Sequence, residues 1–386
     1  MNTWPSRRSV TAGIASVAFA RAMPAAATLR TSETYAIDHA AAKALSNGAA
    51  PGLQIAVMHR GRLLLGNGYG LENIARARPV TTHSIFRIGS LTKQFVAACL
   101  FRLEELGSLS LGSPADRYLP VLRGKAPFTL LEAIHHTAGL HSDEDEASAP
   151  AAASISSQQQ LVDAIAAQPK MFDFEPGTAW QYSNANYVVL GAVIEAVTGQ
   201  SLGQALRALL FKPCGLPFTA VDDGEDIIAH RVTGYSRAAD SEPAVWAEAP
   251  AIDIIQAGGA GAMRSTASDL CRWHFMLLSG RVLRASSLAR LLEPGRLRNG
   301  QLSSTNRYSP EDSHYGDMQY AGGLLVSPTN KRPRIVTHYG FINGFSAVLE
   351  TDLDRMLTLA ACLNSDPGPD LPFHDLRRAV FGVRPA

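Results

Sequence analysis

Apolar residues recur with two different periods along this chain, and the changes of period predict its elements. Two apolar runs, Gln54–His59 and Arg62–Leu65, meet at Arg60 and Gly61, which predicts a β-hairpin. From residue 89 to 106 the apolar positions take helical spacing, and Gly107 suits the end of a helix. The same spacing predicts helices over Leu130–Thr137, Gln160–Ala167, Tyr187–Val197, Leu202–Leu210 and Ala267–Leu278.

The last part of the chain returns to short apolar runs that are typical of strands. Arg334–Thr337, Phe345–Glu350 and Met356–Leu363 predict three strands, and Leu371–Phe381 predicts a final helix. Strands at both ends with helices between them predict an α+β fold. We expect one antiparallel sheet built from both chain ends and flanked by helices, with a helical lobe inserted.

The expected lobes have approximate boundaries in the sequence. The sheet lobe should cover about 28–88 and 320–386, and the helical lobe about 89–319. Two polar segments, 141–160 and 303–319, predict exposed loops of the helical lobe. Because no internal repeat and no linker interrupts these patterns, we expect the two lobes to form one domain.

The first 27 residues have the pattern of an export signal. They contain Arg7, Arg8 and Arg21 and no acidic residue, and a short apolar stretch leads to a small-residue end. The paired arginines indicate the twin-arginine route. We therefore predict a signal peptide at 1–27, a catalytic domain at 28–386, and an exported protein that is periplasmic or secreted.

Composition and charge narrow the classes of protein. Apolar residues make up 46% and charged residues 18%, which is enough to bury a sizeable core. The formal net charge of +1 gives no reason to expect a nucleic-acid partner. No run of apolar residues after the signal is long enough to span a membrane. The four cysteines are widely spaced without a CxxC pattern, and Cys99 and Cys362 should be buried.

Ser90 and Lys93 open the first long helix, three residues apart and therefore on the same face. The helix that follows is apolar nearly all round, so we expect it to be buried. Burial lowers the pKa of a lysine, and such a lysine can take a proton from a neighbouring hydroxyl. The pair thus has the composition of a nucleophile with its base, although a helix-capping serine beside a solvent-reaching lysine would give the same pattern.

Tyr182 and Asn184 form a second candidate pair, between a turn at 175–177 and the helix expected from Tyr187. A tyrosine hydroxyl near a lysine can act as a base or an acid, and an asparagine side chain can orient an amide substrate. The alternative is a helix-capping asparagine next to a surface tyrosine.

A third pattern, HxG, occurs at His59, His314 and His338. The copy at 59 falls in the predicted hairpin turn and the copy at 314 in a polar loop. The copy at 338 ends an apolar strand, from which a side chain can point into a cleft, so we favour His338. An ordinary strand histidine is the alternative at this position.

SxxK, YxN and HxG in this order resemble the serine β-lactamase and penicillin-recognising DD-peptidase superfamily. The chain is most similar to its class C branch, which includes DD-carboxypeptidases, D-aminopeptidases and β-lactamase-like esterases. The likeness covers roughly residues 35–365. It is carried by the segments Ile88–Phe95, Leu130–Leu140, Phe174–Asn184, Gly258–Leu270 and Gly340–Leu349.

The resemblance implies the β-lactamase/DD-peptidase fold and catalytic roles for three residues. Ser90 would attack a carbonyl and become acylated. Lys93 and Tyr182 would share the proton transfers as a coupled pair, because the base in such enzymes is disputed. The implied activity is that of a serine hydrolase acting on D-amino-acid peptides or amides, or on small esters, without a cofactor.

The resemblance also implies a substrate-binding set. Asn184, His338 and Gly340 would contact the substrate, and the backbone N–H groups of Ser90 and Phe341 would form the oxyanion hole. One departure matters, because β-lactamases of this branch usually carry lysine where this chain has His338. A histidine near neutral pH is charged only part of the time. We therefore expect less efficient β-lactam hydrolysis.

Three alternatives stay open at this point. They are a class C-type β-lactamase, a non-catalytic penicillin-binding or sensor domain, and a metal hydrolase. The last would use His135, His136, His141 and Asp143, but adjacent side chains on a helix diverge, so we expect no metal. The expected partner is a small-molecule or peptide substrate, and the oligomeric state is left open.

Overall fold

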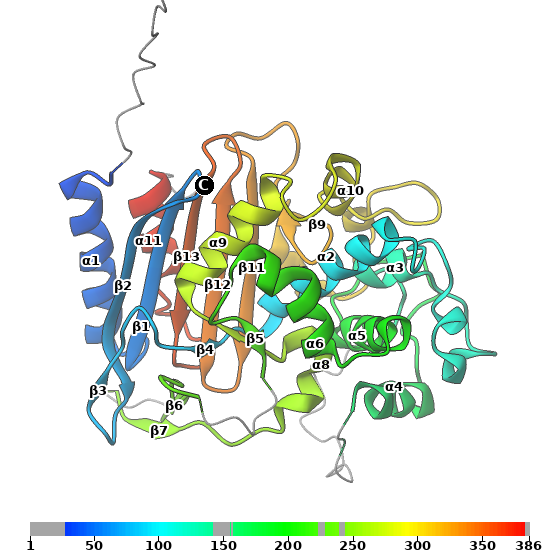
Figure 1. Ribbon diagram of the computed structural model, residues 1–386, viewed down its shortest axis with the longest axis horizontal. Coiled ribbons are helices and arrows are strands. Elements are labelled where there is room, and N and C mark those ends of the chain that lie inside the picture. Colours follow the sequence, from blue (N-terminus) through cyan, green and yellow to red (C-terminus); the bar gives the residue numbers. More distant parts are fainter. Residues whose placement is uncertain (1–27, 142–154, 156, 223–227, 239–243, 383–386) are drawn as a thin grey trace, which may run out of the picture.

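The computed structural model describes most of the chain (Figure 1). The described ranges are 28–141, 155, 157–222, 228–238 and 244–382. The predicted signal at 1–27 and most of the predicted loop at 141–160 lie outside these ranges. Within them, no helix is both long and apolar enough to cross a membrane.

One antiparallel sheet joins the two ends of the chain, in the order β3-β2-β1-β13-β12-β11-β10-β9 (Figure 1). The N-terminal hairpin of β1 and β2 lies beside the last strand, β13, along the whole of Leu53–His59. This arrangement confirms the predicted α+β fold class. The strands are β1 (Gly52–His59), β2 (Arg62–Asn73), β3 (Arg78–Pro79), β9 (Gln319–Tyr320), β10 (Leu325–Val326), β11 (Ile335–Ile342), β12 (Phe345–Asp352) and β13 (Leu357–Leu363).

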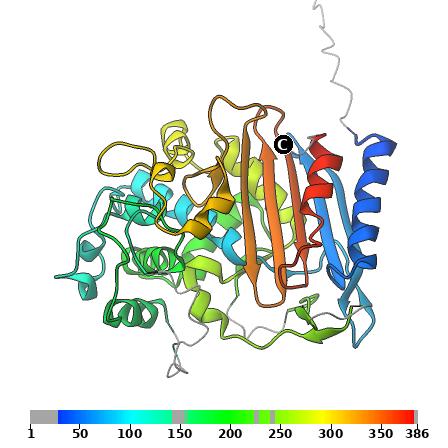
Figure 2. The same cartoon turned by 180° about the vertical axis from the view of Figure 1, so that it is seen from behind.

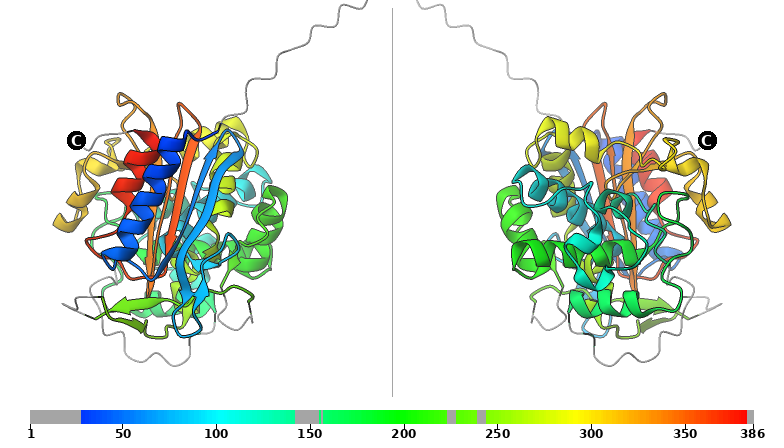
Figure 3. Two further views of the ribbon diagram at one scale, coloured as in Figure 1. Left: turned by 90° about the vertical axis from the view of Figure 1, so that its left-hand side faces the viewer. Right: turned by 90° about the vertical axis from the view of Figure 1, so that its right-hand side faces the viewer.

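Helices cover both faces of this sheet (Figures 2 and 3). α1 (Thr31–Ser46) and α11 (Phe373–Phe381) pack against each other on one face, and α9 (Ala267–Leu278) packs on β1 and β13 from the other. With both faces covered, every residue of β12 and β13 is buried, including polar residues such as Glu350 and Asp352.

Two features of these layers differ from the sequence prediction. α9 falls within the range expected for the helical lobe, but it lies on the sheet because its apolar face packs against the central strands. α1 was not predicted at all. Its buried face consists of Ile37 and three alanines, which give little apolar contrast along the sequence.

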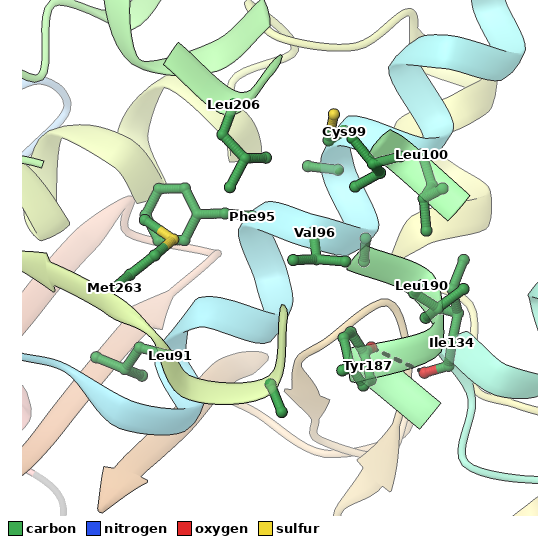
Figure 4. Close-up of a cluster of buried hydrophobic side chains, with 14 of the residues drawn as sticks. Leu91, Phe95, Val96, Cys99, Leu100, Ile134, Tyr187, Leu190, Leu206 and Met263 are labelled. Carbon is green, nitrogen blue, oxygen red and sulfur yellow. Dashed lines mark hydrogen bonds between the residues drawn. The ribbon is translucent and has the colours of Figure 1, made fainter. Parts of the chain in front are cut away.

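The helical lobe is built around α2 (Thr92–Glu105), which has buried residues on nearly every side. α5 (Asn184–Thr198) packs against α2, and their side chains share one core with Leu91 and Met263 (Figure 4). The other helices are α3 (Leu130–Ile134), α4 (Gln158–Ala167), α6 (Leu202–Leu206), α7 (Lys212–Cys214), α8 (Gly258–Gly261) and α10 (Ala285–Leu291). Short strands form two further small sheets, β4 (Phe86–Arg87), β5 (Ala220–Val221) and β8 (Met263–Ser265) in one, and β6 (Tyr235–Arg237) and β7 (Trp246–Glu248) in the other.

Several element boundaries differ from the periodicity. α3 ends at Ile134, because His136 takes a left-handed backbone conformation with φ 59°. α5 begins at Asn184, three residues before the expected start, and β11 continues through His338 to Ile342. The predicted helix over Leu202–Leu210 changes after Leu206 into a π-helical turn. Apolar spacing does not report where the backbone conformation changes, or that polar residues such as Asn184 and His338 belong to α5 and β11.

The backbone of β11 lies directly against the turn that precedes α2. A Cβ at Gly340 would overlap the carbonyl oxygen of Ile88, and a Cβ at Gly89 would lie 2.6 Å from the carbonyl oxygen of Phe341. Gly89 also has φ +47°, which a residue with a side chain rarely adopts. Glycine at these two positions therefore lets the two segments touch.

Substituting Gly340→Ala should separate β11 from this turn. Because the methyl group meets backbone atoms that cannot rotate away, we expect the free energy of unfolding to fall by about 2 kcal/mol. Urea denaturation followed by circular dichroism measures the change. Gly112→Ala is the matched control, since the nearest atom to its Cβ would be a side-chain oxygen 3.9 Å away. Equal midpoints for the two variants would contradict the close packing.

Candidate active site

Ser90 and Lys93 lie side by side where the chain enters α2. Ser90 is in a short 3-10 turn, Gly89–Leu91, and Lys93 is in the first turn of the α-helix. The Lys93 side chain is completely buried, and its Nζ donates a hydrogen bond of 2.9 Å to Ser90 Oγ. The structure therefore brings the two residues of the first pattern together, and the lysine does not reach solvent.

Two further acceptors hold the Lys93 ammonium group. Nζ donates to Asn184 Oδ1 at 2.8 Å and to the carbonyl oxygen of Ala260, in α8, at 3.0 Å. A buried ammonium is tolerated only where its N–H groups find acceptors. The position of Nζ is thus fixed by three separate segments of the chain.

Tyr182 lies over the same ammonium group. The Lys93 Nζ is 4.7 Å from the centroid of the Tyr182 ring, and the ring is largely buried. Ser183 follows as the N-terminal cap of α5, and its hydroxyl donates to the carbonyl oxygen of His141. The start of α5 therefore presents Tyr182 and Asn184 to Lys93 together.

His338 is buried on β11 beside this group, with only 4% of its surface exposed. Its Nδ1 donates to the carbonyl oxygen of Tyr339 at 2.6 Å, so Nε2 is the nitrogen that faces the Tyr320 hydroxyl, 3.4 Å away. Burial, together with the Lys93 charge, lowers the pKa of His338 to about 3. His338 is thus neutral at pH 7, rather than charged part of the time as the sequence led us to expect.

A cleft of about 650 Å³ opens over these residues. Ser90, Tyr182, Asn184, His338 and Phe341 all line it. Gly340 is not among the lining residues, and its backbone packs against the Ile88 carbonyl. The predicted site residues from three distant parts of the sequence therefore meet at one cavity.

Sequence reasoning missed other residues of the cleft wall. They come from the 303–319 segment and from α11, and they include His314, Tyr315, Met318, Phe373 and Arg377. The HxG pattern at His314 was a sequence signal for the residues of the 303–319 segment. Its polar surroundings led us to predict an exposed loop without a role in the site. No local pattern marks α11, because only the sheet places its residues beside the nucleophile.

The histidines of the proposed metal set have other environments. His141 Nδ1 bonds with Asp173, while His135 and His136 are buried, and burial lowers the pKa of His135 to about 4. Asp143 lies outside the described residues. Among the residues that are described, no group of three or more His, Cys, Asp or Glu side chains could hold a metal ion. All four cysteines are described, and they are buried free thiols.

This fold and this arrangement of serine, lysine and tyrosine define the superfamily of serine β-lactamases and DD-peptidases. The family model described as Beta-lactamase matches residues 37–382. The chain therefore belongs to the β-lactamase family, whose relatives include penicillin-binding proteins, amidases and esterases, and it is classed as a β-lactamase-related serine hydrolase.

The similar proteins are named for different activities. Penicillin-binding protein 4* of Bacillus subtilis is 28% identical over 79% of this chain and 66% of its own length. Esterase EstB of Burkholderia gladioli is 35% identical over 42% of this chain and 44% of its own length. Each alignment thus spans less than two thirds of the curated relative. A D-stereospecific amidohydrolase from Streptomyces sp. has a similar structure, with 27% identity and a TM-score of 0.71 over 91% of this chain and 99% of its own.

The neutral state of His338 can be measured directly. We expect its ring nitrogens to show the neutral Nδ1–H form in ¹⁵N NMR spectra throughout pH 5–8, with free imidazole as the reference. Below about pH 6.5 the unfolded chain binds a proton at this ring. The folded chain does not bind it until about pH 3, so acidification through this window lowers the free energy of unfolding. A His338 titration midpoint between pH 6 and 7 would contradict this geometry.

Proposed function

We propose that this protein is an exported serine hydrolase that cleaves D-amino-acid peptides or amides, or small esters, through an acyl-enzyme on Ser90. The observation that carries the proposal is the hydrogen bond between Ser90 and a fully buried Lys93 at the base of the cleft. Export rests on the pattern of residues 1–27.

In the acylation step, Ser90 Oγ bonds to the substrate carbonyl carbon while its proton passes to the coupled pair of Lys93 and Tyr182. The pair accepts it in the form that has lost one proton, either as neutral amine with phenol or as ammonium with phenolate. Lys93 contacts the hydroxyl oxygen directly, and Tyr182 lies between the lysine and the open cleft. The leaving amine or alcohol then takes the proton from this pair as its bond to carbon breaks.

Negative charge develops on the substrate carbonyl oxygen during this step. The backbone N–H groups of Ser90 and Phe341 are the proposed donors to that oxygen. Close packing of β11 on the nucleophile turn supports their pairing, because it brings these two peptide segments into contact. In deacylation a water molecule attacks the acyl carbon and gives its proton to the same pair. The bond to Ser90 Oγ then breaks, the carboxylic acid leaves, and the pair returns the proton to Ser90.

The environment of His338 bears on the choice of substrate. A permanent positive charge at this position would attract the carboxylate that β-lactams carry, and a neutral histidine does not supply it. Several aromatic side chains line the cleft, Tyr182, Tyr315 and Phe341 among them. Arg377 also lines it and is paired with Glu350 at 2.9 Å. Together with the amidohydrolase and the esterase among the relatives, this favours uncharged amides and esters over β-lactams.

Substituting Ser90→Ala should abolish covalent labelling of the purified protein by a fluorophosphonate and by a fluorescent penicillin. The reason is that the variant lacks the oxygen that forms a phosphonate ester with the first probe and an acyl ester with the second. Gel fluorescence measures the labelling. Ser108→Ala is the matched control, because Ser108 is an exposed serine that follows the C-terminal end of α2. Undiminished labelling of Ser90→Ala would overturn the assignment of the nucleophile. Stable labelling of the wild type without any turnover would favour the sensor-domain alternative.

A panel of four substrates on one preparation should separate the remaining activities. It comprises a chromogenic cephalosporin, a D-Ala-D-Ala peptide, a D-amino-acid anilide and a short-chain nitrophenyl ester. We expect kcat/KM for the cephalosporin to be lower than for the anilide and the ester, since these two substrates lack the carboxylate for which His338 provides no cation. Fastest turnover of the cephalosporin by a wide margin would instead identify a class C-type β-lactamase.

A further inference from the structure

His136 lies directly behind Tyr182 and takes no part in the proposed chemistry. Its ring is completely buried, and its centroid is 4.6 Å from that of Tyr182. The rings of Tyr320, at 4.5 Å, and Tyr187, at 5.2 Å, enclose it on other sides. His136 therefore fills the space that Tyr182 would need in order to move away from Lys93.

Hydrogen bonds attach His136 to the chain on both sides of Tyr182. The N–H of Gln181 donates to the carbonyl oxygen of His136 at 3.2 Å. The N–H of Ser183 donates to the His136 ring at Nδ1, also at 3.2 Å, and the Asn186 side chain donates to the same nitrogen. The residues before and after Tyr182 are thus fixed to one histidine.

The protonation state of the ring follows from these bonds. A backbone N–H can only donate, so Nδ1 accepts and the proton of the neutral ring is on Nε2. Burial, with the nearby charge of Lys93, holds the pKa of His136 well below its usual value. The Nδ1 acceptor therefore persists over the pH range in which an acyl-transfer enzyme works.

The backbone conformation of His136 allows its carbonyl group and its ring to bond to Gln181 and Ser183 at the same time. Its φ of 59° is left-handed, which is unfavourable for a residue with a side chain. This conformation ends α3 and points the ring and the carbonyl group of one residue toward the same segment, 181–183. Strain of this kind persists only where the surrounding contacts determine it.

We propose that His136 is a positioning residue, which holds Tyr182 against Lys93 in the geometry that proton transfer needs. The inference rests on the proposed function, because it takes Tyr182 to be part of the proton-transfer pair. It predicts that loss of the Nδ1 acceptor slows chemistry more than it weakens substrate binding. A ring that only filled space would instead affect stability alone.

Three variants distinguish the effect of losing the Nδ1 acceptor of His136 from the effect of changing the side-chain volume. His136→Asn keeps an acceptor close to the position of Nδ1 and tolerates the left-handed backbone. His136→Leu keeps a similar volume and removes the acceptor. His135→Leu is the matched control, because His135 is also buried but its Nε2 makes no hydrogen bond with any described residue.

The first readout is steady-state hydrolysis of a nitrophenyl ester across pH, with melting temperatures recorded in parallel. We expect His136→Leu to lower kcat by about 10- to 100-fold with little change in KM, as for a misplaced catalytic group. The pH profile of this variant should also change shape, because the profile reports the titration of the Lys93–Tyr182 pair and Tyr182 has moved. His136→Asn should stay within about fivefold of the wild type, which a volume effect would not produce. Wild-type kcat in a folded His136→Leu, or equal losses in both variants, would overturn the proposal.

A second readout does not depend on activity. Amide hydrogen exchange at Ser183, followed by NMR, should be faster in His136→Leu and near the wild-type rate in His136→Asn. If wild-type Ser90 is never acylated, the proposed function fails, yet this exchange still decides whether His136 holds the segment. Should His136→Leu not fold, His136→Gln replaces it, since its longer amide cannot put an acceptor at Nδ1. Unchanged Ser183 exchange in the folded variant would refute the positioning role.

Discussion

The charge of Lys93, buried at the junction of the two lobes, is the constraint on which the rest of the site depends. An ammonium group without water requires acceptors at fixed distances. The chain supplies them from Ser90, Asn184 and Ala260, which belong to different elements. The same charge, added to burial, keeps His338 neutral. One buried cation therefore orders the nucleophile and sets the protonation state of its neighbour.

Close contact between the lobes is the second requirement. Two glycines, Gly89 and Gly340, let β11 lie against the nucleophile turn without an intervening side chain. Opposite this contact, the aromatic rings around His136 support Tyr182. The nucleophile is thus fixed from the sheet side, and the tyrosine by His136 of the helical side together with Tyr320 of β9. Neither lobe alone holds the complete arrangement, which explains why the cleft lies between them.

Much of the architecture could be predicted from the chain because apolar spacing reports burial. The β1–β2 hairpin, the paired C-terminal strands and α9 all appear close to their expected positions. α1 was missed because alanines give it little contrast, and α9 lies on the sheet because packing, rather than order in the chain, decides which lobe a helix joins. Boundaries failed where one residue takes an unusual conformation, as His136 does at the end of α3.

For the site, the sequence by itself determined which residue types stand at which spacing, and hence the pairing of Ser90 with Lys93 on one helix face. It also determined the candidates at Tyr182 and His338, since each belongs to a short pattern. Only the tertiary structure decided that these residues meet, that His338 is neutral, and that Arg377 and His314 line the same cleft. The reason is physical: spacing along a helix is local, whereas burial, pKa and cleft walls arise from segments that only folding brings together.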